Sequence, residues 1–328
     1  MLQFDYDIED FMSYCQSQNL RPKTMHSYEQ AIRLFQQYVF NFHNIDAAEK
    51  IQDCHIKEYI KYLQERGKYV VVTNEQSKSI NFPQNRKDLN KPVSETTINN
   101  YLRNMKVFFN YMYSNHNIRI NPFQRIKRKL NNDHKPVDFI QDDDFKKLIK
   151  SFDMGQFHEY RDSTVIQLLI DTGMRIGECL LIKTEDIDVT RRSIYLQSEN
   201  TKARKSRMVF YCAEMGKILK QWLQFKDRYR DSDYLFCTNQ GKPLTVGNFE
   251  TNFKGYTNRV RIKNGHPHML RNNFARRFLL NGGDIYTLSR ILGHSSVVVT
   301  EKAYLDLDDE DLRINYAPYS PLTKIMMK

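Results

Sequence analysis

Six residues whose types suit phosphodiester chemistry follow one another along the second half of the chain. In chain order they are Arg175, Lys202, His268, Arg271, His294 and Tyr304. A phosphodiester that approaches its pentavalent transition state gains negative charge on its non-bridging oxygens. Planar guanidinium groups bind such charge with paired N–H donors. Arginines, a lysine and histidines around a tyrosine make a poor hydrophobic core, and the set therefore predicts an anion-binding active site.

Each member of this set has a role that its chemistry allows. Arg175 and Arg271 form a natural clamp for the anionic transition state. Tyr304 is the candidate nucleophile, although its phenol, with an ordinary pKa of about 10, needs neighbouring cations or a histidine to lose its proton. Lys202, in the basic turn Asn-Thr-Lys-Ala-Arg-Lys-Ser-Arg, is the candidate general acid that protonates the leaving 5′ oxygen.

The two histidines complete the prediction. His268 and His294 can donate hydrogen bonds to the phosphate or shuttle a proton. A structural interpretation exists for each residue taken singly: Lys202 reads as one of several solvated turn cations, and His294 as a packing residue at a helix start. Only the ordered set favours chemistry over these alternatives.

The charge balance indicates a polyanionic partner. The 328 residues include 50 Lys and Arg against 39 Asp and Glu, a formal charge of +11, and the pI is about 9.2. A basic surface attracts and retains nucleic acid, although charge alone fits a merely soluble basic protein equally well. An apolar content of 40% is ample for real cores, and the length has room for two domains.

Cysteine usage and hydropathy point to the cytoplasm. The five cysteines contain no C-x-x-C pair; they are Cys15, Cys54, Cys179, Cys212 and Cys237. An odd, scattered set argues against a disulfide framework or zinc site. No apolar stretch approaches the roughly 18 residues of a membrane span, and the N-terminus lacks the basic and apolar regions of a secretion signal. We therefore expect a cytoplasmic protein without a bound metal.

The first 130 or so residues read as a small bundle of four amphipathic helices. Apolar residues recur at helical spacing over 8–18, from a cap at Thr24, over about 54–66, and from a cap at Ser94. Asn121-Pro122 is expected to end the fourth helical region. Residues 67–93 interrupt the pattern with a polar, basic, turn-rich segment that includes a short strand over 69–73.

A basic run marks the boundary between the two predicted domains. Residues 119–129 carry five basic side chains and no acidic one, which predicts a linker near 130–136 and domains over 1–132 and 133–328. The candidate DNA contacts in this run are Arg125, Lys127, Arg128 and Lys129. The alternative interpretation is a solvated spacer.

The second domain is predicted to be mostly helical with a small antiparallel sheet, so the fold class is mostly α (α+β). Helices are expected over 142–152, 160–172, 213–228, 246–258, 268–281 and 284–292. Gly173 suits a C-terminal helix cap that delivers Arg175 at a helix–helix junction. Strands over 193–197 and 207–211 would form a hairpin around the basic turn. Arg204 and Lys205 in this turn are further candidate DNA contacts.

Three segments resemble the signature boxes of the tyrosine recombinase (phage integrase) family. They are Thr172-Gly-Met-Arg-Ile-Gly-Glu178, Pro267-His-Met-Leu-Arg271, and Ile291-Leu-Gly-His-Ser295 followed by Thr300-Glu-Lys-Ala-Tyr304. The resemblance extends from about Thr24 to Leu307. It implies an arginine clamp, a hairpin lysine, two histidines and a tyrosine nucleophile at the six positions given above.

The resemblance also carries expectations about architecture and partners. It implies a helical core-binding (SAM-like) domain followed by a catalytic domain, a C-shaped clamp around duplex DNA, no metal or nucleotide cofactor, and a tetrameric synapse. Two features depart from the family pattern. Tyr304 follows His294 by ten residues, where many members use nine and Ala303 occupies that place, and residues 67–93 look like an insertion.

The resulting prediction is a site-specific DNA recombinase or integrase that works through a 3′-phosphotyrosine. It would be a monomer or dimer when free and a homotetramer on DNA, with accessory DNA-bending or directionality proteins as further candidates. The alternatives are an integrase-fold transcriptional regulator without recombinase activity and a type IB topoisomerase-like enzyme. After Tyr304 an acidic segment and an extended tail are expected to dock on another subunit or to pack on their own domain.

Overall fold

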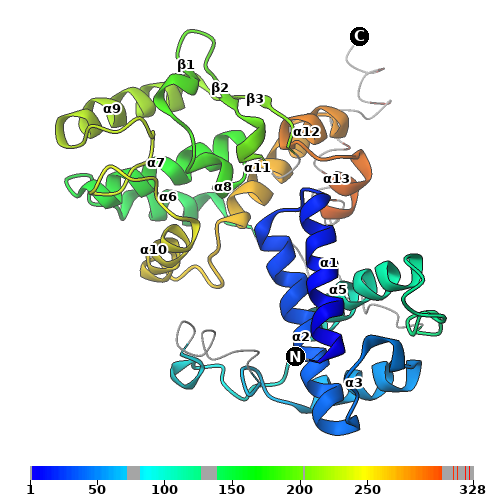
Figure 1. Cartoon of the computed structure of the whole chain (residues 1–328). Coiled ribbons are helices and arrows are strands. Elements are labelled where there is room, and N and C mark those ends of the chain that lie inside the picture. The colour runs from blue at the N-terminus through cyan, green and yellow to red at the C-terminus, as the bar shows by residue number, and fades with distance from the viewer. Residues whose placement is uncertain are drawn as a thin grey trace. The chain divides into compact units, whose positions relative to one another are not determined.

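The computed structural model describes residues 2–71, 82–126, 139–201 and 204–304, and four separate positions in the tail. The chain divides into two compact units, Met1–Asp133 and His134–Lys328 (Figure 1). The predicted class is confirmed, because the described chain is mostly helical and has one small antiparallel sheet. None of the helices in these described ranges is both long and apolar enough to cross a lipid bilayer.

The first unit is built from helices around an aromatic core. Its elements are α1 (Gln3–Ser17), α2 (Pro22–His43), α3 (Asp53–Glu65) and α5 (Glu95–Ser114), with short 3-10 turns at Ala48–Lys50 and Pro83–Asn85. Helix α5 contacts both α2 and α3. Phe11 and Phe108 meet edge to face with ring centroids 5.4 Å apart, and Phe35 meets Tyr59 at 5.0 Å. Such pairs favour this geometry because a ring edge is positive and a ring face negative.

Helix starts in this unit follow capping chemistry, with one correction. Ser94 caps α5 as predicted, since its hydroxyl accepts a hydrogen bond from the Thr97 amide at 3.3 Å. The prediction that Thr24 caps the second helix is wrong, because α2 begins at Pro22. Proline fits a first helical position, where its missing N–H would have had no helical partner. At the other end, α5 stops at Ser114, ahead of Asn121-Pro122.

The segment between α3 and α5 does not form the strand expected over 69–73. Gly67 and Pro92 make an isolated bridge, and Tyr69 has a φ of 62°. A left-handed residue turns the chain and cannot continue a strand. Positions 72 and 73 lie outside the described residues.

The second unit contains eight helices within the described ranges. They are α6 (Asp142–Lys150), α7 (Phe157–Thr172), α8 (Ile176–Cys179), α9 (Ala213–Tyr229), α10 (Val246–Arg259), α11 (His268–Leu280), α12 (Ile285–Leu292) and α13 (Val297–Tyr304). The sheet has the order β1 (Ile187–Asp188), β2 (Ser193–Leu196), β3 (Arg207–Phe210), and all its pairs are antiparallel. Ile194 pairs with Val209 in the predicted hairpin. Short 3-10 turns lie at Thr184–Asp186 and Ser198–Asn200.

Helix α7 is the element on which the site is assembled. It packs against α11 and α9, and it is buried on several sides. Gly173 ends it in the left-handed conformation with a φ of 65°, as predicted. A Cβ at this glycine would lie 2.2 Å from Cδ1 of Phe274 in α11. The glycine therefore both turns the chain and lets α11 approach the end of α7.

Candidate active site

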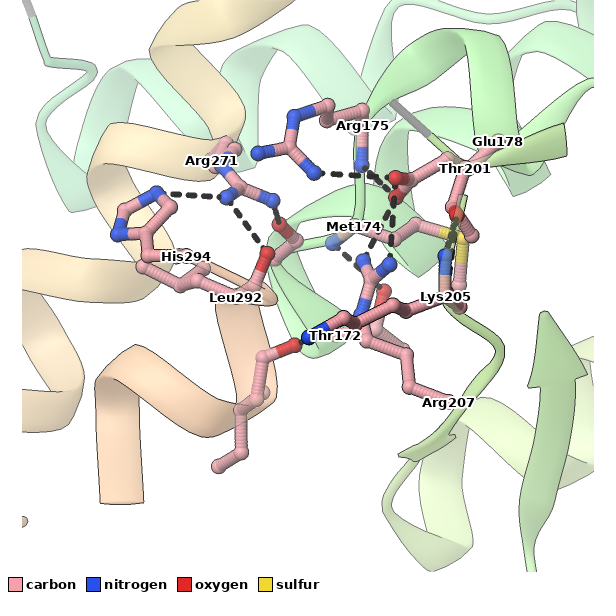
Figure 2. A network of polar contacts seen from close by, with 12 residues as sticks. Thr172, Met174, Arg175, Glu178, Thr201, Lys205, Arg207, Arg271, Leu292 and His294 are labelled. Carbon is pink, nitrogen blue, oxygen red and sulfur yellow. Dashed lines mark hydrogen bonds and ion pairs between the residues drawn. The ribbon is translucent and has the colours of Figure 1, made fainter. Parts of the chain in front are cut away.

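A buried carboxylate, Glu178, lies between two arginines (Figure 2). Its side chain is 2% exposed. Oε1 accepts hydrogen bonds from Nη1 of Arg175 at 3.0 Å and from Nη1 of Arg207 at 3.2 Å. Oε2 accepts from the Arg175 amide at 3.0 Å and from Nη2 of Arg207 at 2.6 Å. Four donors thus surround one carboxylate.

These donors keep Glu178 ionised. Burial is the largest influence and by itself raises the pKa of the carboxyl group. The hydrogen bond and charge of Arg207, followed by the amide and charge of Arg175, reverse that effect, so that the pKa of Glu178 falls below its ordinary value. The carboxylate is therefore a fixed anchor for both arginines at neutral pH.

Arg175 is held at one side and open at the other. Gly173 ends α7, Met174 is buried, and Arg175 is the residue that precedes α8. Its side chain is 29% exposed. Among the described residues, the guanidinium uses only Nη1 in a hydrogen bond, which leaves Nε and Nη2 for a ligand.

Arg271 binds the C-terminal carbonyls of two helices. This residue of α11 is 3% exposed. Its Nη1 donates to the carbonyl of Gly173 at 2.8 Å, and its Nη2 donates to the carbonyl of Leu292 at 2.8 Å. Both α7 and α12 end on a glycine with a φ of 65°, Gly173 and Gly293. One buried guanidinium thus satisfies carbonyls that a helix end leaves without a helical partner.

The hydrogen-bond partners of His294 assign it a neutral ring and one tautomer. Its Nε2 lies 2.9 Å from Nη2 of Arg271, and its Nδ1 lies 2.8 Å from Oγ1 of Thr300. A guanidinium only donates, so Nε2 accepts and the ring proton is on Nδ1, which donates to Thr300. Burial first, and then the charge of Arg271, lower the pKa of His294 to about 4.

This geometry predicts the titration of His294. In ¹⁵N spectra of the free protein we expect a neutral ring protonated at Nδ1, with a pKa of about 4. The folded pKa lies below the ordinary 6.5, and the unfolded chain therefore binds the proton first. Stability should accordingly fall as the pH drops from about 6.5 to about 4. A His294→Asn variant assigns the resonance, and a ring protonated at Nε2 with an ordinary pKa would contradict the tautomer.

His268 begins α11 and is exposed. Its Nδ1 lies 3.0 Å from Oδ1 of Asn272. Desolvation by neighbouring protein atoms, with a smaller contribution from the charge of Arg271, lowers the pKa of His268. In the described part of the chain no hydrogen bond joins it to the cluster around Arg271. It stands one helical turn before Arg271 and on the same side of α11.

Lys202 lies outside the described residues, and its described neighbours on both sides are joined by hydrogen bonds. The Arg204 amide donates to the carbonyl of Thr201 at 3.2 Å. The buried hydroxyl of Thr201 accepts from the Lys205 amide at 3.1 Å. This turn joins β2 to β3, and Arg204 and Lys205 in it are exposed.

The remaining predicted residues are described only in part. Tyr304 is the last residue of α13, one helical turn after Thr300, and its side chain lies outside the described part. Arg125 is exposed. Residues 127–129, residues 72–81 and nearly all of the segment after 304 lie outside the described part of the chain. The cluster of Figure 2 itself sets three guanidinium groups against one carboxylate, so it carries a net positive charge that suits a phosphate.

Two residues that bind members of the cluster were not predicted from the sequence: Arg207, which binds Glu178, and Thr300, which binds His294. Arg207 reads as one more cation of the basic turn, and Thr300 reads as a residue of no special role between His294 and Tyr304. Glu178 belongs to the Thr-Gly-Met-Arg-Ile-Gly-Glu segment, but nothing in that segment shows that its carboxylate is buried. Only the folded chain brings Arg207 to Glu178 and Thr300 to His294.

Comparison with known families assigns both units. The Phage integrase family matches residues 138–311, and the Phage integrase SAM-like domain matches residues 8–130. The tyrosine recombinase of Thermosipho africanus is 32% identical over 222 residues, which is 66% of this chain and 74% of that protein. Tyrosine recombinase XerC of Pediococcus pentosaceus is 27% identical over 235 residues, 70% of this chain and 77% of that protein.

Solved structures share the fold at lower identity. The Tn1549 transposon integrase, in complex with a circular intermediate DNA, matches with a TM-score of 0.71 and 18% identity over 95% of this chain and 98% of that chain. A lambda integrase dimer bound to a COC′ core site matches with a TM-score of 0.66 and 14% identity over 92% of this chain and 94% of that chain.

Proposed function

Because the chain belongs to the phage integrase family, we propose that it is a site-specific DNA recombinase that cuts and rejoins duplex DNA through a 3′-phosphotyrosine at Tyr304. The observation that carries the proposal is the cationic cluster in which Glu178 holds Arg175 and in which Arg271 holds His294. Helix α13 runs from this cluster through Thr300 to Tyr304.

The reaction is a pair of transesterifications. The phenolic oxygen of Tyr304 forms a bond to phosphorus while the bond from phosphorus to the 5′ oxygen breaks. The phenolic proton passes to a neutral histidine, and Lys202 protonates the leaving 5′ oxygen. In the second step the 5′-hydroxyl of the partner strand attacks the phosphotyrosine and releases Tyr304. The bond energy is retained, and no nucleotide cofactor is required.

The arginines stabilise the charge that develops during both steps. Arg175 offers Nε and Nη2 to a non-bridging oxygen while Glu178 fixes Nη1. Arg271 places a second positive charge beside it and holds the ends of α7 and α12 at fixed positions. Donors that are in place before the reaction need no rearrangement when the charge appears.

The proposal extends to the domains and partners. Residues 1–132 would form the SAM-like core-binding domain, with 67–93 as an insertion, and 133–328 the catalytic domain. The DNA contacts would include Arg125, Lys127, Arg128, Lys129, Arg204 and Lys205. We infer action in the cytoplasm as a homotetramer on DNA, assembled from free monomers or dimers, with the tail after Tyr304 docked on a neighbouring subunit. Accessory DNA-bending or directionality proteins fit the same scheme.

A suicide substrate tests the function directly. Nicked duplexes made from the genomic flanks of the gene lose the short fragment after cleavage, so the covalent protein–DNA adduct accumulates and is resolved on a denaturing gel. An adduct supports the recombinase. Tight binding without any adduct would identify an integrase-fold regulator instead. Relaxation of supercoiled DNA that lacks paired sites would identify a topoisomerase-like enzyme.

The basic run is expected to follow the DNA backbone. Each phosphate contact adds about 0.9 to the slope of log K against log salt. If each side chain contacts one phosphate, replacing Arg125, Lys127, Arg128 and Lys129 by glutamine should therefore reduce the magnitude of that slope by about 3.6. The matched control removes four exposed cations of ordinary ion pairs, Lys57, Lys61, Lys146 and Arg191. Equal slopes for wild type and the first variant would make the run a solvated spacer.

A further inference from the structure

Arg207 connects three segments of the proposed active site. It is the first residue of β3 and follows Lys202 by five positions. Its side chain is only 13% exposed. All three guanidinium nitrogens donate hydrogen bonds: Nη1 and Nη2 to Glu178, and Nε to the carbonyl of Ile291 at 3.2 Å. A solvated turn cation has no such set of partners.

The fork to Glu178 joins the hairpin to Arg175. Arg207 contacts Oε1 at 3.2 Å and Oε2 at 2.6 Å, so each carboxylate oxygen receives one of its N–H groups. Each oxygen receives its other donor from Arg175. Paired contacts of this kind fix orientation as well as distance, which a lysine cannot do.

The contact to Ile291 joins the hairpin to the segment that carries His294. Ile291 lies in the last turn of α12, three residues before His294. A Cβ at Gly293 would lie 3.0 Å from Nε of Arg207 and 3.1 Å from its Cδ. The absence of a side chain there lets the guanidinium lie against the turn of Leu-Gly-His.

We propose that Arg207 is a positioning residue that fixes the base of the β2–β3 hairpin, and with it Lys202, relative to Arg175 and His294. The inference rests on the proposed recombinase function and on Lys202 as the general acid. A general acid must come within hydrogen-bond reach of the leaving oxygen, and a displacement of about 1 Å can cost about a hundredfold in rate. Arg207 anchors the start of β3, the strand that follows the turn, and so limits such displacement.

The chemistry of the leaving group separates this role from simple structural support. When sulfur replaces the 5′ bridging oxygen, the Tyr304 oxygen forms its bond to phosphorus while the phosphorus–sulfur bond breaks and a thiolate leaves. A thiolate is a much weaker base than an alkoxide and departs without a proton. Cleavage of the sulfur substrate therefore does not depend on a placed general acid, whereas it still depends on the arginine clamp.

The test compares cleavage of nicked oxygen and sulfur substrates by the full-length protein. We expect Arg207→Gln to lose at least about tenfold more rate on the oxygen substrate than on the sulfur substrate, as Lys202→Ala should. The cleavage rate of Arg175→Lys should fall by similar factors on both substrates. Arg191→Gln changes an exposed cation of the β1–β2 turn and should cleave both substrates at the wild-type rate. Equal losses on both substrates by Arg207→Gln, or no loss, would overturn the proposal.

Two further measurements keep the outcome clear. If thermal unfolding shows that Arg207→Gln does not fold, Arg207→Lys replaces it; this variant keeps a cation beside Glu178 but cannot reach both Glu178 oxygens and Ile291. The same preference for sulfur is expected, and equal losses would again overturn the proposal. Wild-type protein that cleaves neither substrate would contradict the recombinase function itself, which is a different result from a wild type that cleaves both.

Discussion

Replacing Tyr304 by phenylalanine is expected to abolish the covalent protein–DNA adduct and to leave DNA affinity within about twofold of wild type. The substitution removes the nucleophilic oxygen and keeps the ring. Binding is expected to change little because affinity for DNA comes mainly from contacts to many phosphates. Adduct formation on a nicked substrate and a binding isotherm at the same salt concentration measure the two effects.

The loss of the adduct in the Tyr304→Phe protein is the largest expected effect, and the position of α13 supports it. Thr300 contacts His294, and position 304 follows it by one turn, so both lie on the same side of the helix. The proposed nucleophile therefore belongs to the same helix as the residue that binds His294. Tyr286→Phe, which changes an exposed tyrosine of α12, is the matched control. An adduct that persists in the Tyr304→Phe protein would mean that another nucleophile operates.

The second large effect is expected for Arg175→Lys, whose cleavage rate should fall by at least about a hundredfold with DNA binding largely kept. The guanidinium donates to Glu178 through Nη1 and offers its other nitrogens to the phosphate. A lysine has one charged nitrogen at the end of a flexible chain and cannot hold both partners in a fixed plane. The loss falls on the transition state because that is where the charge develops.

Single-turnover cleavage and equilibrium binding separate the two quantities for this variant. Arg191→Lys makes the same change at a side chain that is 84% exposed, and it should cleave at the wild-type rate. Cleavage by Arg175→Lys within a few-fold of wild type would exclude Arg175 from the reaction. Loss of binding in parallel with cleavage would instead assign Arg175 to ground-state recognition.

Local chemistry made much of the scaffold predictable. The left-handed cap at Gly173, the Ser94 cap and the hairpin of β2 and β3 all follow from residue types and short spacings. Helix α13 did not, because three consecutive valines favour a strand, whereas the folded chain packs this segment as a helix against α12 and α11. Strand β1 has two residues, too few to show any alternation.

The inner part of the site could not be predicted for a different reason. The contact of Arg207 with Glu178 spans 29 positions, and its contact with Ile291 spans 84. Periodicity and capping report neighbours within a few residues and carry no record of such pairs. A basic turn looks the same in the sequence whether its last arginine faces water or a buried carboxylate.

The two left-handed glycines give this site an uneven tolerance to mutation. Any side chain at Gly173 or Gly293 is strained by the backbone, and it also meets Phe274 or Arg207. The same two turns end the helices whose carbonyls Arg271 binds. A change at either glycine therefore harms folding and chemistry together, whereas a change at Arg175 harms mainly chemistry. In a library of variants, cellular abundance and recombination should fall together at the glycines and separate at the arginine.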